Sequence, residues 1–310
     1  MRLSVAICTH NPDESLLERT LDSIVDQLAG SPDTELLVVD NNSSESVALN
    51  PRFGRFSEVR WLSEPKPGLT AARAKVIAEA TGEVITFVDD DNLLDAGYLN
   101  LVRENFTDDP KLGLLGGAVI PDYVEPPPKW LHRFEESLAI RRYRADFKAT
   151  VAEKAWSPLF PIGAGMSMRA DLARDYVAHC EASEAIEGRR GGELSSGEDL
   201  DMGLYSLSRS LHLKVDGRLR LTHVIPPTRT EIEYMVELTR GAVRSSWLVE
   251  CKWRPILDRP IFPMFHLPAA QLYPRVAIAR VMAPFSSSFR IKNAVYEEVV
   301  KARLNRSARG

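Results

Sequence analysis

Three consecutive carboxylates, Asp89-Asp90-Asp91, follow a short apolar stretch that runs from Glu83 to Val88. Adjacent like charges repel and raise one another's pKa, so a strand end that keeps three of them is expected to meet a cation. Hard divalent cations take oxygen ligands, and Mg²⁺ in particular is held by one or two carboxylates together with substrate phosphates. The alternative is a solvated acidic turn in which Asp91 and Asn92 cap the next helix. This run alone leaves both interpretations open.

A second acidic pair, Glu198-Asp199, follows a glycine-rich stretch, 187–197, that is predicted to be a mobile loop. The pair is expected to begin a helix that continues to about Ser210, where the N-terminal end of the helix dipole favours an ionised carboxylate. Asp201 lies on a different face of the same predicted helix. Simple capping of the helix would also account for these acids.

The elements that position these acids alternate between apolar strands and amphipathic helices, which predicts βαβ units and a mostly parallel sheet with ligands at the carboxyl ends of its strands. The expected strands are Leu3 to Cys8, Glu35 to Val39, Val59 to Leu62 and Glu83 to Val88, and the expected helices are Glu14 to Leu28 and Leu69 to Ala80. Three of these strands end in polar residues, namely Thr9-His10-Asn11, Asp40-Asn41-Asn42 and the three aspartates.

The middle of the chain is less regular. A proline-rich loop, Pro121 to Trp130, cannot join a ladder and is expected to be a lid or a wrapping segment. The other predicted elements are a strand Leu112 to Ile120, a helix Phe134 to Phe147, a strand Phe160 to Met168, a helix Leu172 to Ala182, a strand pair Lys214 to Leu221 around Asp216-Gly217, and a helix Thr230 to Glu250.

Composition bounds the class of protein. A chain of 310 residues with 44% hydrophobic and 26% charged residues is typical of a globular protein with a full core. The three cysteines are far apart and in no metal-ligand spacing, which fits a reducing cytosol and predicts neither a disulfide framework nor a zinc site. We find neither a signal-peptide pattern at the start of the sequence nor a run of 18 uncharged apolar residues, so a cytoplasmic protein is expected.

The net charge of -4 conceals an asymmetry. Residues 251–310 carry eleven Lys and Arg against three acids, a local balance of +8, so the first 250 residues carry -12. The acidic charge of the first 250 residues argues against nucleic acid as their partner. The basic segment 251–310 is instead a candidate for binding to an anionic membrane surface. The alternative for this segment is a helical extension that packs on the rest of the protein or forms a homo-oligomer contact.

Seven pieces in this order and spacing resemble the family 2 glycosyltransferases of GT-A fold over about residues 1–240: VAICTHNP, VVDNNSS, PGLTAARA, FVDDDN, GAGMSMRAD, GEDLDMGLY and THVIPPTRT. The resemblance implies a Rossmann-like α/β catalytic domain, residues 1–228, followed by a basic C-terminal helical extension, residues 229–310. It also implies a nucleotide-diphosphate-sugar donor, Mn²⁺ or Mg²⁺ as cofactor, and inversion at the anomeric carbon.

The resemblance assigns a role to each matching residue. In the donor site, it implies that Thr9 and Asn11 line the base pocket, Asp40 accepts the uracil imide proton, Arg73 lies near the base or the diphosphate, Asp90 holds the ribose with Asp89 in support, and Arg229 reaches a phosphate. Asp91 is the expected metal ligand, and His223 either closes over the diphosphate or joins the metal. An imide-accepting carboxylate would select uracil over cytosine, although Asp40 can equally cap its own loop as an Asx-turn.

For the acceptor, the resemblance makes Asp199 the general base, with Glu198 and Asp201 as the alternative carboxylates. Two positions depart from the family pattern: His10 stands where many relatives have Tyr, and Gly165 stands where Asn is common. The second change leaves the identity of the sugar open.

The sequence therefore predicts a hexosyltransferase that uses a UDP-sugar and a saccharide or lipid-linked acceptor in bacterial polysaccharide or glycoconjugate synthesis, either free in the cytoplasm or peripheral on the inner membrane face. Two other functions compete with it. A metal-dependent nucleotidyltransferase would need a glycine-rich basic loop after the first strand, where this chain has Thr9-His10-Asn11-Pro12. A nucleotide-sugar-binding scaffold would not need both the acidic run and the Glu198-Asp199 pair.

Overall fold

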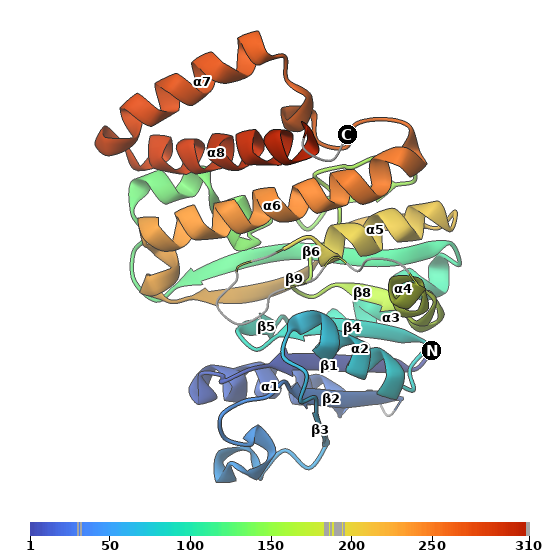
Figure 1. The fold of residues 1–310 in the computed structure, drawn as a ribbon. Coiled ribbons are helices and arrows are strands. Elements are labelled where there is room, and N and C mark those ends of the chain that lie inside the picture. The colour runs from blue at the N-terminus through green and yellow to red at the C-terminus, as the bar shows by residue number, and fades with distance from the viewer. Residues whose placement is uncertain are drawn as a thin grey trace. The chain divides into compact units, whose positions relative to one another are not determined.

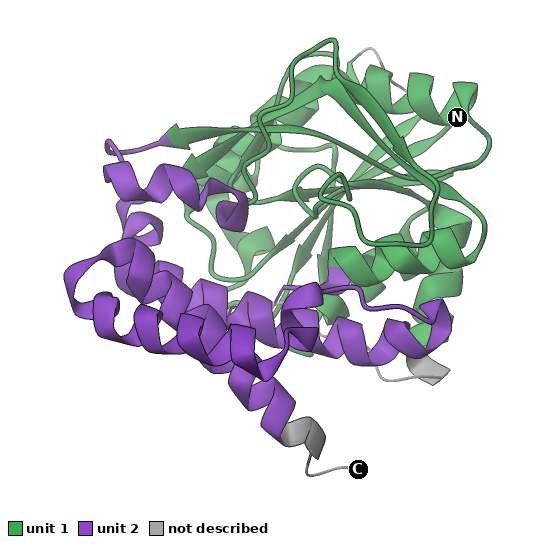
Figure 2. Cartoon of the chain, turned by 90° about the horizontal axis from the view of Figure 1, so that it is seen from above, with its two compact units in different colours: residues 1–122, 139–185, 199–224 green, residues 123–138, 186–198, 225–310 purple. Residues whose placement is uncertain are grey.

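The computed structural model describes residues 1–29, 31, 33–182, 186, 188, 194 and 196–307, without the side chains of 181–182 and 305–307. The chain divides into two compact units, drawn in green and purple in Figure 2. The first unit contains residues 1–122, 139–185 and 199–224, and the second contains residues 123–138, 186–198 and 225–310. The last division falls between residues 224 and 225, and two earlier segments also belong to the second unit. The domain boundary at 228/229 stays a prediction.

Among the described residues, nine strands form one sheet in the order β3-β2-β1-β4-β8-β6-β9-β5, with β7 pairing with β9 (Figure 1). Their bounds are β1 Leu3–Thr9, β2 Thr34–Asp40, β3 Val59–Ser63, β4 Val84–Asp89, β5 Asn92–Leu94, β6 Leu112–Tyr123, β7 Lys148–Val151, β8 Ser167–Arg169 and β9 His212–Ile225. The predicted parallel order is present from β3 to β4. Beyond β4 the sheet is mixed, since β8 pairs antiparallel with β4 and β6, and β9 pairs antiparallel with β5 and β7.

The parallel register brings the polar strand ends to one edge of the sheet. Thr9 lies opposite Asp40, and Cys8 lies opposite Asp89. The strands themselves are almost wholly buried, as their continuous apolar sequences predict. The helices of this region are α1 Glu14–Leu28, α2 Leu69–Glu79, α3 Tyr98–Asp108, α4 Ala170–Ala182 and α5 Glu198–Ser208.

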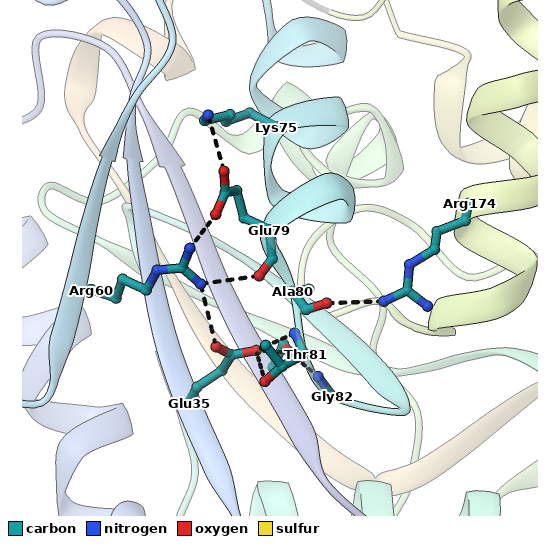
Figure 3. A network of polar contacts seen from close by, with 9 residues as sticks. Glu35, Arg60, Lys75, Glu79, Ala80, Thr81, Gly82 and Arg174 are labelled. Carbon is teal, nitrogen blue, oxygen red and sulfur yellow. Dashed lines mark hydrogen bonds and ion pairs between the residues drawn. The ribbon is translucent and has the colours of Figure 1, made fainter.

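A polar network at the opposite edge of the sheet fastens the first strands to α2 (Figure 3). Arg60 of β3 donates to the Glu79 carboxylate at the end of α2 and lies 3.9 Å from Glu35 Oε2 of β2. Glu35 Oε1 accepts hydrogen bonds from Ser4 Oγ at 2.5 Å and Thr81 N at 2.6 Å. Burial alone would raise the pKa of Glu35, but these hydrogen bonds outweigh it and hold the pKa below its usual value. The network therefore contributes to fixing where α2 ends and β4 begins.

The predicted helix Phe134 to Phe147 is wrong. Only Glu135–Leu138 is helical, as the 3₁₀ turn η4, and Ala139 then adopts a positive φ of 63° that ends it. Arg141 forms a backbone bridge with Val119 of β6, with N···O distances of 2.9 and 3.0 Å. Hydrogen bonding to the sheet thus overrides the helical periodicity of this segment.

The predicted strand pair around Asp216-Gly217 is also wrong, because β9 passes through these residues without a turn. Asp216 is fully buried and accepts hydrogen bonds from Arg218 Nη2 at 2.6 Å and Asn105 Nδ2 at 3.2 Å. Burial alone would raise the pKa of Asp216, but these bonds outweigh it and lower the pKa to about 2. An Asp-Gly dipeptide usually marks a turn, but here its carboxylate is satisfied inside the protein.

Other expectations differ in extent. The strand predicted at Phe160 to Met168 is confined to β8, and α6 Ile232–Leu257 extends the predicted helix beyond Glu250. The prediction that the proline-rich loop cannot join a ladder is wrong for its first three residues, 121–123, which belong to β6. The rest of the loop leads into the 3₁₀ helix η3 Lys129–Arg133. Most of the predicted loop 187–197 lies outside the described residues.

The second unit is built mainly from three helices, α6, α7 Ala269–Met282 and α8 Ser287–Ser307, and α8 packs against both of the others (Figure 1). Its apolar core includes Val243, Phe265, Leu272, Val299 and Ala302. Glu250 of α6 is buried, and its carboxylate accepts hydrogen bonds from the backbone N–H groups of residues 261 and 262, both at 2.9 Å, and from the His266 ring. No helix within the described part of the chain is both long and apolar enough to span a membrane.

Candidate active site

The three aspartates lie where β4 ends, at the edge of the sheet that also carries the ends of β1 and β2. Asp89 closes β4, and Asp90 and Asp91 form the turn into β5. Thr9 Oγ1 donates to the Asp90 carboxylate, and Thr20 Oγ1 of α1 donates to the Asp90 carbonyl at 3.1 Å. The helix-capping alternative does not describe this turn, because the next helix begins only at Tyr98 after Gly97. Asp90 is thus fixed by two elements.

Asp91 faces His223 across two antiparallel strands. Asn92 of β5 pairs with His223 of β9, and the Val224 N–H donates to the Asp91 carbonyl at 3.0 Å. This register leaves His223 Nε2 3.5 Å from Asp91 Oδ2, with both residues buried. Asn92 Nδ2 donates to Asp91 Oδ1 at 2.6 Å and so orients the carboxylate. Sequence reasoning treated Asn92 only as a capping residue and missed this role.

The Asp91–His223 pair fits a divalent ion that is held jointly with a phosphate ligand. Two atoms can bind one ion only if their separation is at most twice the metal–ligand distance, about 4.2 Å for Mg²⁺. The 3.5 Å between Asp91 Oδ2 and His223 Nε2 meets this condition. In the described parts of the chain, no group of three or more His, Cys, Asp or Glu is arranged so that it could hold a metal ion by itself. Any ion here would therefore need further ligands from phosphate and water, which is the usual arrangement for Mg²⁺.

At the end of β2, the Asp40 carboxylate caps its own loop. Its two oxygens accept hydrogen bonds from Ser43 N and Val47 N, both at 3.1 Å. Asp40 thus caps its own loop, although the donors are three and seven residues further on and not two, as in an Asx-turn. Recognition of uracil by Asp40 stays a prediction that would use the remaining lone pairs. Asn11 adopts a positive φ of 48° and accepts from Ser44 N at 2.8 Å, which ties the loops after β1 and β2 together.

Asn41 is a positioning residue that sequence reasoning missed. Its Nδ2 donates to the carbonyls of Glu64 at 3.0 Å and Lys66 at 2.8 Å, and its Oδ1 accepts from Gly68 N at 2.8 Å. Gly68 precedes α2 with a φ of 123°, a conformation that favours glycine. Asn41 thereby sets where α2 begins and, one turn later, where Arg73 lies. The run Asp40-Asn41-Asn42 indicates polar contacts at the end of β2, but the sequence does not show which asparagine binds the loop before α2.

Arg73 and Asp199 form a partly buried ion pair beside β4. Arg73 Nη1 lies 2.8 Å from Asp199 Oδ1, and the backbone N–H of Gly163 donates to Asp199 Oδ2 at 2.7 Å. The Arg73 guanidinium carbon lies 5.3 Å from the centroid of the Phe87 ring, and Phe87 precedes Asp89 by two residues in β4. The Arg73 side chain is 4% exposed, whereas that of Asp199 is 32% exposed. Asp199 is thus held in one orientation and remains open to an incoming group, while contact of Arg73 with a donor stays a prediction.

Two glycines close to this pair leave no room for a side chain. A Cβ at Gly163 would lie 2.4 Å from Arg73 Nη2 and 3.0 Å from both Asp199 oxygens. Gly165 has a φ of 73°, and a Cβ there would lie 2.5 Å from the Tyr98 hydroxyl. That hydroxyl donates to the Gly165 carbonyl at 2.7 Å, and burial raises the pKa of Tyr98. The asparagine common at position 165 in relatives would not fit this packing.

The remaining predicted site residues lie elsewhere. Asp201 is fully buried and accepts a hydrogen bond from the Tyr176 hydroxyl at 2.8 Å, which joins α5 to α4. Glu198 is buried at the start of α5, and the division between the two units falls between it and Asp199. Arg229 lies in the second unit, in the 3₁₀ helix η5 Pro227–Thr230. The roles foreseen for Glu198, Asp201 and Arg229 stay predictions.

The sheet has the GT-A fold, a Rossmann-like α/β architecture, and solved structures agree. The mannosyltransferase PcManGT from Pyrobaculum calidifontis, in complex with GDP-Man and Mn²⁺, matches with a TM-score of 0.58 at 16% identity over 98% of this chain and 86% of its own. TarS 1-349 from S. aureus matches with a TM-score of 0.53 at 14% identity, over 100% of this chain and 92% of its own. At such low identity, the likeness shows the fold alone.

The family is shown by sequence. Residues 4–177, more than half of the chain, match the family described as Glycosyl transferase family 2, so the chain belongs to this family. Two curated relatives are a glucosyl-dolichyl phosphate glucuronosyltransferase from Haloferax volcanii, 28% identical, and a poly(ribitol-phosphate) beta-glucosyltransferase from Bacillus spizizenii, 34% identical. The matches cover 42% and 35% of this chain, but only 42% and 18% of the two relatives. The chain thus matches less than half the length of either relative.

Proposed function

We propose that the protein is an inverting glycosyltransferase that moves a hexosyl group from a UDP-sugar to a hydroxyl of a saccharide or lipid-linked acceptor in polysaccharide or glycoconjugate synthesis. The observation that carries the proposal is the Asp91–His223 pair at the end of β4, where Asp91 Oδ2 lies 3.5 Å from His223 Nε2. The neighbouring residue Asp90 accepts a hydrogen bond from Thr9. Membership of Glycosyl transferase family 2 supports sugar transfer. The PcManGT structure contains GDP-Man and Mn²⁺, so both uridine and guanosine donors need to be tested.

In this proposal the donor lies along the strand ends. The base meets Thr9, Asn11 and Asp40, and the ribose meets Asp90 with Asp89 in support. Asp91 and His223 would hold Mn²⁺ or Mg²⁺, and Arg229 would contact the diphosphate. When bound, the ion supplies positive charge that offsets the charge developing on the departing diphosphate.

Asp199 is the proposed general base. The acceptor oxygen forms a bond to the anomeric carbon while the bond from that carbon to the diphosphate oxygen breaks, and its electron pair leaves with the nucleoside diphosphate. The acceptor's hydroxyl proton moves to an oxygen of Asp199. Arg73 and the Gly163 N–H each occupy one lone pair of the carboxylate, which leaves others for this proton. A single displacement inverts the anomeric configuration.

The two competing functions make different demands on the same residues. In a nucleotidyltransferase, the second substrate would attack a phosphorus atom of the nucleotide. That reaction would not need a base oriented as Asp199 is. A nucleotide-sugar-binding scaffold would not need Asp199 either. Loss of turnover in Asp199 variants therefore distinguishes the glycosyltransferase from both alternatives.

Thermal unfolding with UDP, GDP and ATP, each with and without Mn²⁺, tests the donor site. We expect a rise in Tm of about 5 °C with UDP and Mn²⁺ at a hundredfold excess over Kd. Asp91→Asn should abolish the metal-dependent part of this rise. The control is Asp108→Asn, which alters an exposed carboxylate at the end of α3 and should leave the rise unchanged. A rise in Tm with GDP but not with UDP would contradict the recognition of uracil by Asp40. No rise in Tm with any of the three nucleotides would contradict the transferase proposal.

Turnover of the stabilising nucleotide sugar then tests the base. Asp199→Asn should lower donor hydrolysis or transfer about 10²- to 10⁴-fold, because the acceptor proton loses its receiver. Nucleotide binding by this variant should remain as in the wild type. Near-normal turnover by Asp199→Asn would refute the assignment.

A further inference from the structure

The solvent-facing surface of α7 carries both apolar residues and arginines, neither of which is needed there for packing against the rest of the protein. Leu272, Val276 and Ala279 recur at helical spacing and are covered to different degrees by the rest of the second unit, where α7 packs against α8. Three apolar residues stand two positions after these, about 200° around the helix: Pro274, Ile278 and Val281. The helix therefore has an apolar face toward α8 and a second apolar face on its opposite side.

The second face is exposed. Ile278 is 57% exposed, Val281 is 67% exposed, and Phe285, in the 3₁₀ turn η7 Ala283–Phe285 that follows α7, is 79% exposed. Tyr273 on the flank is 58% exposed. A soluble surface tolerates single apolar side chains, but a continuous stripe of them marks an interaction surface.

The charge around this stripe is of one sign. Arg275 lies about 90° around the helix on one side of the stripe, Arg280 lies about 130° around it on the other side, and both are exposed. The structure gives neither arginine an acidic partner among the described residues, and the sequence contains no acid between Asp258 and Glu297. A partner that covers the stripe therefore meets positive charge that this region does not neutralise.

We propose that this outward face, the α7 surface made of Ile278, Val281 and Phe285 with Arg275 and Arg280, binds the surface of an anionic lipid bilayer. A helix that lies in the membrane interface inserts an apolar stripe between the headgroups and pairs its basic flanks with lipid phosphates. A second copy of the chain fits less well, because two such faces would bring arginine against arginine without a carboxylate between them. The inference holds whichever nucleotide sugar the first unit uses.

Co-sedimentation of the full chain with vesicles tests the proposal. We expect binding to vesicles that contain phosphatidylcholine and phosphatidylglycerol, and much weaker binding to phosphatidylcholine alone. The double variant Arg275→Gln/Arg280→Gln should bind the anionic vesicles roughly 30-fold more weakly, because each basic residue near such a surface contributes about 1 kcal/mol, or about fivefold. The control Arg244→Gln/Arg254→Gln removes the same charge from α6 and should bind nearly as the wild type does.

The apolar stripe has its own variant. Ile278→Ser/Val281→Ser/Phe285→Ser should weaken vesicle binding roughly hundredfold, because three side chains no longer transfer from water to the acyl boundary. These side chains are exposed, so circular dichroism and Tm should stay as in the wild type. A matched control replaces three comparably exposed apolar residues on α6 and α8 with Ser: Leu248, Ile256 and Leu304, which are 54%, 59% and 62% exposed.

Three outcomes would overturn the proposal. The first is that the wild type fails to sediment with anionic vesicles. The second is that the stripe variant and its matched control lose vesicle binding equally. In the third, the stripe variant would bind vesicles normally but lose a concentration-dependent dimer in size-exclusion chromatography with light scattering. That result would assign the face to a second copy of the chain.

Discussion

Replacing Gly163 with alanine would place a methyl group inside the Arg73–Asp199 ion pair. The new Cβ would lie 2.4 Å from Arg73 Nη2 and 3.0 Å from both carboxylate oxygens of Asp199, whereas ordinary van der Waals contact begins at 3.4 Å. Residue 163 is not among those with positive φ, so alanine can adopt its backbone conformation. The side chains must move instead, the guanidinium by about 1 Å if only the contact distance is restored.

The size of the expected effect follows from this displacement. If Asp199 is the base, a shift of about 1 Å lowers kcat roughly hundredfold, because catalytic groups act only within a narrow range of positions. The carboxylate also loses part of its hydrogen bonds to Arg73 and Gly163, which we expect to lower the free energy of unfolding by about 1 to 3 kcal/mol. The protein should therefore still fold at 25 °C.

The assay compares kcat, KM for the donor and Tm of wild type, Gly163→Ala and a control, Gly54→Ala. Gly54 has a φ of -60°, and a Cβ there would lie 3.3 Å from the Pro51 carbonyl, so the control should change neither kcat nor Tm by much. A wild-type kcat for Gly163→Ala would refute the role of this ion pair in catalysis. A loss of nucleotide binding with kcat unchanged would place Arg73 on the donor instead.

Three other substitutions test separate parts of the structure. Arg73→Lys keeps the charge but not the planar fork that orients Asp199, so kcat should fall about 10- to 100-fold; a raised donor KM at normal kcat would contradict this positioning role and leave only the predicted contact with the donor. His223→Gln removes the imidazole proposed as a metal ligand, and titration of the nucleotide-bound protein should show Mn²⁺ affinity reduced at least tenfold, whereas an unchanged affinity would exclude His223 from the metal site. The folded pKa of Asp216, about 2, is below its unfolded value of 3.8, so its ion pair with Arg218 stabilises the protein above about pH 4, and this contribution is lost as the pH falls toward 2. Denaturant unfolding should show Asp216→Asn less stable than wild type by about 1 to 2 kcal/mol near neutral pH, with a gap that narrows below pH 4; a gap independent of pH would show that the carboxylate is not the cause.

The strand ends could be predicted from the sequence because their signal is local. Each of β1, β2 and β4 is a continuous apolar run that stops at polar residues, and parallel strands joined by helices must place those ends at one edge. Thr9, Asp40 and Asp89 therefore lie together as expected. The start of α5 at Glu198-Asp199 was predictable for the same kind of reason, since acids favour the first turn of a helix.

The failed predictions lie where long-range pairing decides the local structure. The segment Phe134 to Phe147 has helical spacing, but Arg141 forms its backbone hydrogen bonds with Val119 of β6. Asp216-Gly217 has the composition of a turn, but the strand continues because Arg218 and Asn105 satisfy the buried carboxylate. In both segments, hydrogen bonds to partners far along the chain outweigh a weak local preference.

The sequence by itself determined the family resemblance, the parallel half of the sheet and the row of polar residues at its edge. Only the tertiary structure decided how those residues pair. His223 reaches Asp91 because β9 runs antiparallel to β5 in one particular register, and Arg73 reaches Asp199 across 126 residues of sequence. Periodicity records which side of an element is buried, but it does not record which distant element covers that side. That choice depends on packing the whole sheet, and it turned an acidic strand end and a lone histidine into one candidate site.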